Sequence, residues 1–241
     1  MPEKYISVLF SGGLDSAVLV ADAAASASAP AQPSGTRVVP IYISAGFAWE
    51  DEERAMARRL FAASPFAAAV EPLVELRFDM RDIFPATHWA VRGEPPAFDT
   101  PDEDVYLDGR NVILLSKAAV YMAATFPRAA AGQEAWGILL GTLAGNPFPD
   151  ATPSFFAAIA RALSLGLARP IAVEAPFAAL HKSDVIRRGL ELGVPLELTL
   201  SCMQPRDGLH CGRCSKCRER RDAFRDAGVS DPTRYRQTPL R

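Results

Sequence analysis

The sequence lacks any apolar stretch that approaches the roughly 18 consecutive residues needed to cross a membrane. Its opening segment, MPEKYISVLF, contains too short an apolar run for the hydrophobic region of a signal peptide. A formal net charge of -2 provides no overall attraction to nucleic acid or to anionic membrane surfaces. We therefore expect a cytoplasmic protein that binds no membrane and no nucleic acid stably.

Cysteine is also scarce, and its clustering is informative. All four cysteines lie within residues 202–217, in the spacing C-x8-C-x2-C-x2-C: Cys202, Cys211, Cys214 and Cys217. Disulfides are rare in a reducing cytosol, whereas short C-x2-C spacings are typical of tetrahedral zinc sites. Because four thiolates leave no open position on the metal, we predict a structural Zn²⁺ site. His210 is a competing ligand, and the same cysteines could instead form disulfides or hold an iron–sulfur cluster.

Basic residues surround this cysteine module. They are Arg213, Lys216, Arg218, Arg220, Arg221 and Arg225. We interpret them as a solvent-exposed helix face whose charge is balanced by Glu219, Asp222 and Asp226, with a nucleic-acid-binding patch as the alternative.

Strand and helix patterns alternate along the chain, which indicates an α/β fold with a parallel, doubly wound sheet of about five strands. The predicted strands cover residues 4–10, 37–44, 70–78, 135–142 and 171–176. The predicted helices cover residues 15–25, 49–63, 111–125, 154–165, 182–192 and 216–227. Segment 81–108 lacks periodicity, as is typical of a binding loop or lid. We expect one boundary, which divides a main domain of residues 1–197 from a small C-terminal zinc module of residues 198–241.

The segment SGGLDS, Ser11–Ser16, carries more chemistry than a turn between a strand and a helix requires. It matches neither GxxxxGKS/T nor GxGxxG, the two common phosphate-binding loops. Glycines let the backbone approach a ligand, and the start of a helix presents free N–H groups to an anion. The hydroxyls of Ser11 and Ser16 add hydrogen bonds, whereas Asp15 would repel phosphate unless a cation such as Mg²⁺ lay between them. The segment therefore predicts a site for phosphate and Mg²⁺, with a plain turn as the alternative.

The pattern SGGxDS resembles the PP-loop of the N-type ATP pyrophosphatases, which split ATP between its α and β phosphates. The resemblance implies an adenine nucleotide alpha hydrolase-like fold, in which ATP is bound by Ser11, Gly12, Gly13, Leu14, Asp15 and Ser16. Together with C-x8-CGxCxxC near the C-terminus, it makes nearly the whole chain similar to the 7-cyano-7-deazaguanine synthases of queuosine biosynthesis.

Two further segments carry this family resemblance to the nucleotide. LDGRNVILLSKAA implies that Arg110 and Asn111 lie near ATP, and LHKSDVIRRGLELG implies that Lys182 reaches its phosphates. The resemblance gives catalytic roles to Asp15, Ser16 and Lys182. An ammonium group is well suited to stabilise the charge of departing pyrophosphate.

The segment NPFPDATPSFF resembles the family's aromatic-Pro-Asp loop, which implies that Asn146, Phe148 and Asp150 contact the substrate. Phe148 stands where the family has tyrosine, and Ala151-Thr152 replaces a Cys-Arg pair. These departures bear on the identity of the substrate and leave the ATP machinery intact.

Aromatic residues also replace a basic, polar loop of the family, in the segment SAGFAWEDE. Phe47 and Trp49 in this segment, and His88 and Trp89 further along, have two interpretations. They could stack on a planar base, or they could pack against helices and the loop of residues 81–108.

The resemblance implies an ATP-dependent carbon–nitrogen ligase that converts 7-carboxy-7-deazaguanine and ammonia to 7-cyano-7-deazaguanine through an adenylated intermediate. Its cofactors would be ATP, Mg²⁺ and Zn²⁺, its partners would be small molecules, and members of the family tend to form homodimers. Three alternatives stay open: a related PP-loop enzyme that amidates or forms a nitrile on a different carboxylate, a PP-loop enzyme that thiolates tRNA, and a non-enzymatic zinc-ribbon binding module.

Overall fold

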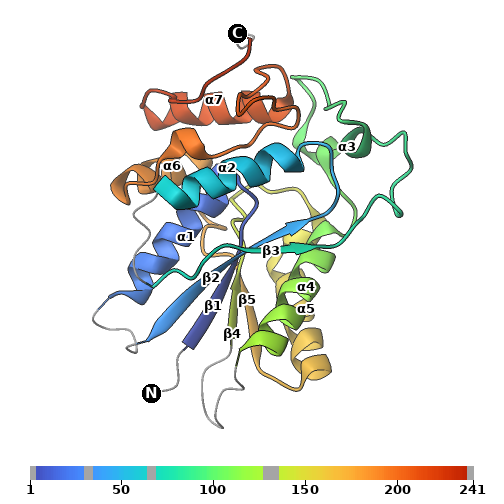
Figure 1. Cartoon of the computed structure of the whole chain (residues 1–241), viewed down its shortest axis with the longest axis vertical. Helices are drawn as coiled ribbons and strands as arrows, with labels where there is room; N and C mark the ends of the chain where they lie inside the picture. The colour runs from blue at the N-terminus through green and yellow to red at the C-terminus, as the bar shows by residue number, and fades with distance from the viewer. Residues whose placement is uncertain (1–3, 30–34, 64–68, 127–135, 238–241) are drawn as a thin grey trace.

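A parallel five-stranded sheet with the order β3-β2-β1-β4-β5 organises the computed structural model (Figure 1). The structure describes residues 4–29, 35–63, 69–126 and 136–237. The strands are β1 (Lys4–Leu9), β2 (Thr36–Ser44), β3 (Val74–Arg77), β4 (Trp136–Leu139) and β5 (Ile171–Glu174). β2 and β3 follow β1 on one side of it, whereas β4 and β5 lie on its other side. The switch in strand order therefore lies between β1 and β4, where open α/β sheets bind ligands.

Helices cover both faces of the sheet, which confirms the doubly wound α/β fold (Figure 1). On one side α1 (Leu14–Ala27) packs on the sheet, and its apolar core extends to α2 (Glu50–Ala63), α6 (Lys182–Glu191) and α7 (Ser215–Ala227), with α6 against α1 and α7 against α6. The other face packs against α4 (Arg110–Thr125) and α5 (Pro153–Leu167). Among the described residues, no helix is long and apolar enough to span a membrane.

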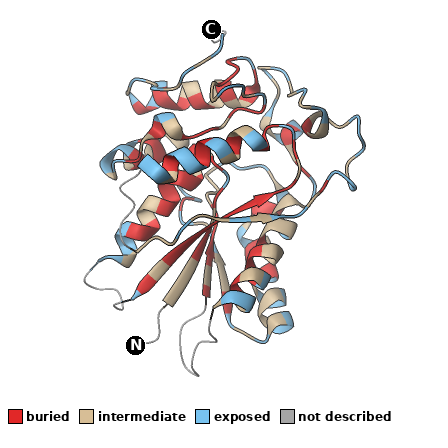
Figure 2. Cartoon of the chain, viewed as in Figure 1, coloured by how far each residue is buried: buried red, intermediate tan, exposed pale blue. Residues whose placement is uncertain are grey.

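Strand β2 shows how the sequence produces two cores. Successive side chains of a strand point to opposite faces of a sheet. Val38 and Tyr42 accordingly join the core beneath α1, while Val39, Ile41 and Ile43 join the core beneath α4 and α5. Figure 2 shows buried positions along the strands and exposed positions on the outer side of α2. A strand that is apolar on both faces is thus required at this central position.

The predicted elements are all present, but two of the predicted strands are substantially shorter in the structure. We expected a strand over 70–78, but β3 begins only at Val74. Val70 forms an isolated bridge with Val38, and Pro72 then interrupts the pairing because proline has no N–H to donate. The strand predicted over 135–142 also ends early, since β4 ends at Leu139, and residue 135 lies outside the described residues.

Segment 81–108 contains only short helices, α3 (Trp89–Arg92) and η1 (Asp102–Val105). Its aromatic and apolar residues form a third core with the C-terminal cysteines. This core includes Phe47, Trp49, Met80 and Ala90. The segment therefore covers the end of the sheet where the C-terminal module also lies.

The C-terminal module is attached to the rest of the chain by a buried arginine. Arg220 is 0% exposed, so our interpretation of this residue as part of a solvated helix face is wrong. Its guanidinium donates to the Leu196 carbonyl (2.7 Å) and to the hydroxyls of Thr199 (2.8 Å), Ser201 (3.3 Å) and Thr233 (2.6 Å). Helical spacing alone could not show this, because the acceptors come from segments outside α7. The division at residue 198 stays a prediction.

Replacing this arginine tests whether the attachment stabilises the fold. We expect Arg220→Met to lower the free energy of unfolding by about 2–4 kcal/mol, because four acceptors lose a charged donor. Urea unfolding is the measurement. Arg225→Met on the exposed side of the same helix is the matched control, and it should change the free energy by less than about 0.5 kcal/mol. Equal effects of the two substitutions would contradict this role of Arg220.

Candidate active site and metal centre

The SGGLDS segment joins the carboxyl end of β1 to the start of α1, where the strand order switches. The Ser11 N–H donates to the Ser16 hydroxyl (3.1 Å), which donates to the Gly13 carbonyl (3.0 Å). Gly12 has a φ of 76°, a left-handed conformation that glycine adopts without strain. Its carbonyl accepts the Leu200 N–H (2.8 Å). The loop is therefore a preformed turn that is fastened to the C-terminal part of the chain.

Lys182, the residue that the family resemblance places near the ATP phosphates, is the first residue of α6 and reaches this loop. Its Nζ lies 3.2 Å from Asp15 Oδ2 and 2.5 Å from Glu219 Oε1 on α7. Burial alone would lower the pKa of Lys182, but the two carboxylates outweigh burial and raise it. Burial likewise opposes ionisation of Glu219, yet Lys182 and Lys216 lower its pKa to about 2. The lysine is therefore a stable cation at neutral pH.

The other oxygen of Asp15 shows what this carboxylate can bind. Oδ1 is buried and has no hydrogen-bond partner among the described residues. Burial raises the pKa of Asp15, although Lys182 opposes the shift. An unpartnered carboxylate oxygen beside a phosphate-type loop is the kind of ligand that Mg²⁺ takes. The donor set present thus fits a divalent cation.

Two adjacent cavities open at the carboxyl ends of the strands, and the SGGLDS loop lies between them. The smaller, of about 250 Å³, is lined largely by strand ends and the start of α4, including Leu9, Ile41, Ile43, Leu114 and Leu140. The larger, of about 360 Å³, is lined by charged and aromatic side chains, including Trp49, Glu53, Trp89, Asp102, Lys182, Lys216 and Glu219. Ser11, Gly13, Asp15, Arg110 and Phe148 line both.

The predicted nucleotide residues at the start of α4 line the smaller cavity. Arg110 is the first residue of the helix, and its guanidinium lies 5.9 Å from the centre of the Phe47 ring. Asn111 is bonded to the predicted substrate loop instead of being free. Its backbone N–H donates to Asp150 Oδ2 (3.0 Å), and its Nδ2 donates to the Asp150 carbonyl (3.0 Å). The carboxylate of Asp150 therefore anchors the first turn of α4.

The predicted substrate residues lie together in one turn on the cavity wall. Asp150 is only 5% exposed, and burial raises its pKa against the effect of the Asn111 hydrogen bonds. The Asn146 side chain accepts the Phe148 N–H (2.9 Å), which holds the turn. Phe148 stacks on Tyr106 with ring centres 5.1 Å apart. Both rings line the smaller cavity, and sequence reasoning did not single out Tyr106.

Four rings that could either stack on a base or pack within the protein are found to pack chiefly on one another: Phe47, Trp49, His88 and Trp89. Phe47 and Trp49 are 4% and 6% exposed, and their ring centres are 5.2 Å apart. Trp49 also stacks on Trp89 (5.6 Å), whose neighbour His88 caps the start of α3 through Nδ1. The edges of Trp49 and Trp89 still line the larger cavity. The rings thus form a rigid wall of that cavity.

Two buried glutamates of α2 were missed by sequence reasoning, which noted only that acidic residues suit a helix N-terminus. Glu50 accepts hydrogen bonds from the backbone N–H groups of Ala45 (2.8 Å) and Gly46 (2.9 Å). Glu53 accepts the Tyr42 hydroxyl (2.9 Å) and lines the larger cavity. Burial, reinforced by Glu50, raises the pKa of Glu53 to about 8. Their spacing of three residues on one helix face was the available signal.

The four cysteines form the second centre. Their ligand atoms all lie within 4.8 Å of one another, and all four side chains are buried. The backbone N–H groups of Gln204 (3.3 Å) and Cys211 (3.2 Å) donate to Cys202 Sγ, as expected around metal-bound thiolates. His210 Nε2 accepts the Ser201 N–H (3.2 Å) and lies outside this ligand set. The four thiols therefore fit one tetrahedral metal ion.

The shifted pKa of Glu53 predicts a pH dependence of stability. Its folded pKa of about 8 exceeds the unfolded value near 4.5, so the protonated carboxyl favours folding at low pH. This contribution is lost as the pH rises through that interval, by up to about 1.4 kcal/mol per pH unit. We expect Glu53→Gln, which cannot ionise, to become progressively more stable than the native chain with rising pH. Urea unfolding of both across the interval measures this, and parallel pH curves would contradict it.

Known proteins are similar to this chain over nearly its whole length. The family described as "Queuosine biosynthesis protein QueC" matches residues 5–228. Two relatives are named 7-cyano-7-deazaguanine synthase. The protein from Methanoculleus marisnigri is 33% identical, over 94% of this chain and 96% of the relative. The protein from Methanothrix thermoacetophila is 35% identical, over 94% of this chain and 96% of the relative. The solved structure of U34-tRNA thiolase NcsA from Methanococcus maripaludis aligns with a TM-score of 0.47 at 9% identity, over 94% of this chain and 68% of that one. The family match and the curated relatives confirm the resemblance: the chain belongs to the queuosine biosynthesis protein QueC family of PP-loop enzymes.

Proposed function

We propose that this protein is an ATP-dependent ligase that converts 7-carboxy-7-deazaguanine and ammonia to 7-cyano-7-deazaguanine. The names of its relatives supply the product, and the family resemblance supplies the acid and the ammonia. The observation that carries the ATP chemistry is the placement of Lys182 within 3.2 Å of Asp15, on the SGGLDS loop. Both groups face a cavity that is large enough for phosphates and a second substrate.

The smaller cavity suits the nucleoside of ATP. Its apolar lining from the ends of β1 and β2 and from α4 matches the faces of an adenine ring. The phosphates would then extend along the loop, where the start of α1 and the hydroxyls of Ser11 and Ser16 offer donors. Asp15, with its unpartnered Oδ1, would hold Mg²⁺. When bound, this ion neutralises phosphate charge.

The larger cavity suits the acid and the departing pyrophosphate. A carboxylate oxygen of the acid attacks the α phosphorus of ATP, and the bond to the β phosphate breaks. Lys182 stabilises the charge that develops on the leaving pyrophosphate. Ammonia then attacks the adenylated carboxyl carbon and expels AMP, which leaves an amide after proton loss. A second adenylation, on the amide oxygen, allows loss of AMP and protons to form the nitrile.

None of these steps requires a nucleophile from the protein. All four cysteines of the sequence belong to the buried cluster, so no separate cysteine is left to carry sulfur, and thiolation would require an iron–sulfur cluster in place of zinc. This observation disfavours the tRNA-thiolating alternative. A related enzyme that acts on a different carboxylate is an outcome of the assay below.

The assay combines the protein with ATP, Mg²⁺, ammonium and 7-carboxy-7-deazaguanine, and mass spectrometry follows AMP and the nitrile. We expect both products, and we expect Lys182→Met to lower kcat by about a hundredfold or more, because one charged stabilising group is lost. Arg161→Met, an exposed cation on α5, is the control and should retain full activity. AMP formed only with another acid would change the substrate, and no AMP with any acid would reject the ligase.

We further propose that the metal of the cysteine cluster is a structural Zn²⁺ ion. Metal analysis should find one zinc per chain in protein purified without chelator. Cys217→Ser should lose the zinc and lower the unfolding temperature by about 10 °C or more, because metal binding contributes to folding. Arg213→Met, at an exposed position between Cys211 and Cys214, should retain both. Iron in place of zinc, or full stability of the serine variant, would contradict the proposal.

A further inference from the structure

Five side chains of alternating charge connect the SGGLDS loop to the metal-binding module. Lys182 lies between Asp15 (3.2 Å) and Glu219 (2.5 Å). Glu219 Oε2 also accepts from Lys216 Nζ (2.8 Å), and Lys216 Nζ lies 3.2 Å from Asp102 Oδ1. All five line the larger cavity. The charges therefore form one continuous network around a space that a ligand can enter.

The two residues from α7 are held there by the metal centre. Lys216 and Glu219 are three positions apart, so they share one face of the helix. Cys214 immediately precedes α7 and Cys217 lies in its first turn, so the two cysteines flank Lys216. Because both are buried in the cysteine cluster, they fix the rotation of the helix about its axis and so the direction in which Lys216 and Glu219 point. Segment 81–108 secures the helix from outside, since Arg218 donates to the Thr100 carbonyl (3.2 Å). The module thus presents an ammonium and a carboxylate to the cavity.

The charge balance indicates what the ammonium is suited to bind. A triphosphate carries several negative charges, and Lys182 can offset only one of them. Lys216 is one quarter exposed (26%), and its two carboxylate partners are 28% and 43% exposed. The Lys216–Asp102 pair is open to water, so it is worth little by itself. Phosphate oxygens that enter the cavity can therefore replace Asp102 beside Lys216 at small cost, while Lys216 keeps its contact with Glu219.

We propose that α7 is part of the ATP site, with Lys216 as a second ammonium that contacts the outer phosphates and Glu219 as the residue that positions Lys182. This inference rests on the proposed use of ATP. It gives the metal module a part in catalysis through the helix that the cysteines orient. Glu219 acts through Lys182 and does not itself touch the substrate.

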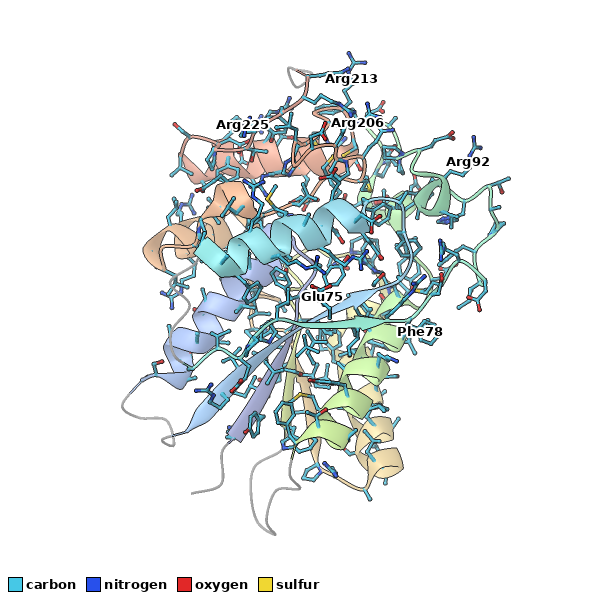
Figure 3. All side chains as sticks on the ribbon, viewed as in Figure 1. Glu75, Phe78, Arg92, Arg206, Arg213 and Arg225 are labelled. Atoms are coloured by element: carbon cyan, nitrogen blue, oxygen red, sulfur yellow. The ribbon has the colours of Figure 1, made fainter. Side chains whose placement is uncertain are left out.

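The test for Lys216 is the affinity for ATP, pyrophosphate and AMP, measured by equilibrium binding with Mg²⁺ and without any acceptor acid. We expect Lys216→Met to weaken binding of ATP and pyrophosphate by about tenfold or more, and that of AMP by less than about twofold. Lys216→Arg keeps the charge and should bind ATP within about threefold of the native protein. Arg225→Met removes a cation from the exposed outer side of α7 and should change nothing (Figure 3).

Equal weakening of ATP and AMP by Lys216→Met, or no weakening, would overturn the assignment of this residue. Because no acid is present, the result does not depend on whether the deazapurine is the substrate. A native protein that binds no ATP would instead reject the proposed function.

The test for Glu219 is a comparison of kcat with KM, with AMP formation as the readout and the acid that the native protein adenylates as the substrate. A glutamine has one acceptor oxygen and no charge, so it cannot hold two ammonium groups. We expect Glu219→Gln to lower kcat by about tenfold, with the KM for ATP nearly unchanged and the metal content retained. Unchanged kcat, or loss of metal and of thermal stability together with kcat, would overturn a positioning role.

Discussion

One ammonium group held between two carboxylates joins the parts of this structure. Lys182 begins α6, Asp15 belongs to the loop that leaves the central strand, and Glu219 belongs to the helix of the cysteine module. A lysine this far from solvent stays charged only if anions compensate for its lost hydration. The contact therefore requires that the ends of α1, α6 and α7 that carry these side chains meet. The packing of α6 between α1 and α7, within one apolar core, meets that requirement.

The C-terminal module depends on more than its metal ligands. Arg220 is buried and bonded to the segment that follows α6, and the Leu200 N–H donates to Gly12 in the loop itself. A change in the module would consequently reach the SGGLDS turn through the backbone. The cysteine cluster and the candidate ATP site are thus one connected unit, although their residues lie far apart in the sequence. From the sequence we predicted these two sites separately, whereas in the structure hydrogen bonds and ion pairs join them.

The cavity walls away from the SGGLDS loop are aromatic, whereas the walls around Asp15 and Lys182 are charged. Asp150 and Asn146 hold the local backbone, which leaves aromatic faces from Tyr106 and Phe148 on the cavity wall. Trp49 stacks on both Phe47 and Trp89 and also interacts with the buried Glu53 of α2. Rigid aromatic walls suit a flat heterocycle, and the buried carboxyl adds one group whose proton is retained near neutral pH. Whether two copies of the chain assemble as a homodimer, as members of the family tend to do, stays a prediction.

Local patterns in the sequence determined the alternating elements, the SGGLDS turn and the set of four cysteines that could hold a metal. In each case the deciding residues are close in the chain: strand alternation, glycine conformations and C-x2-C spacing act over a few positions. The family resemblance predicted that Lys182 reaches the ATP phosphates, and the structure places it beside Asp15 in the SGGLDS loop. The burial of Arg220, the raised pKa of Glu53 and the placement of Lys216 and Glu219 in the cavity were not predicted. These depend on which distant segments pack against one helix face, because burial and neighbouring charge decide whether the same side chain is solvated or part of a site. Only the tertiary structure supplies those neighbours.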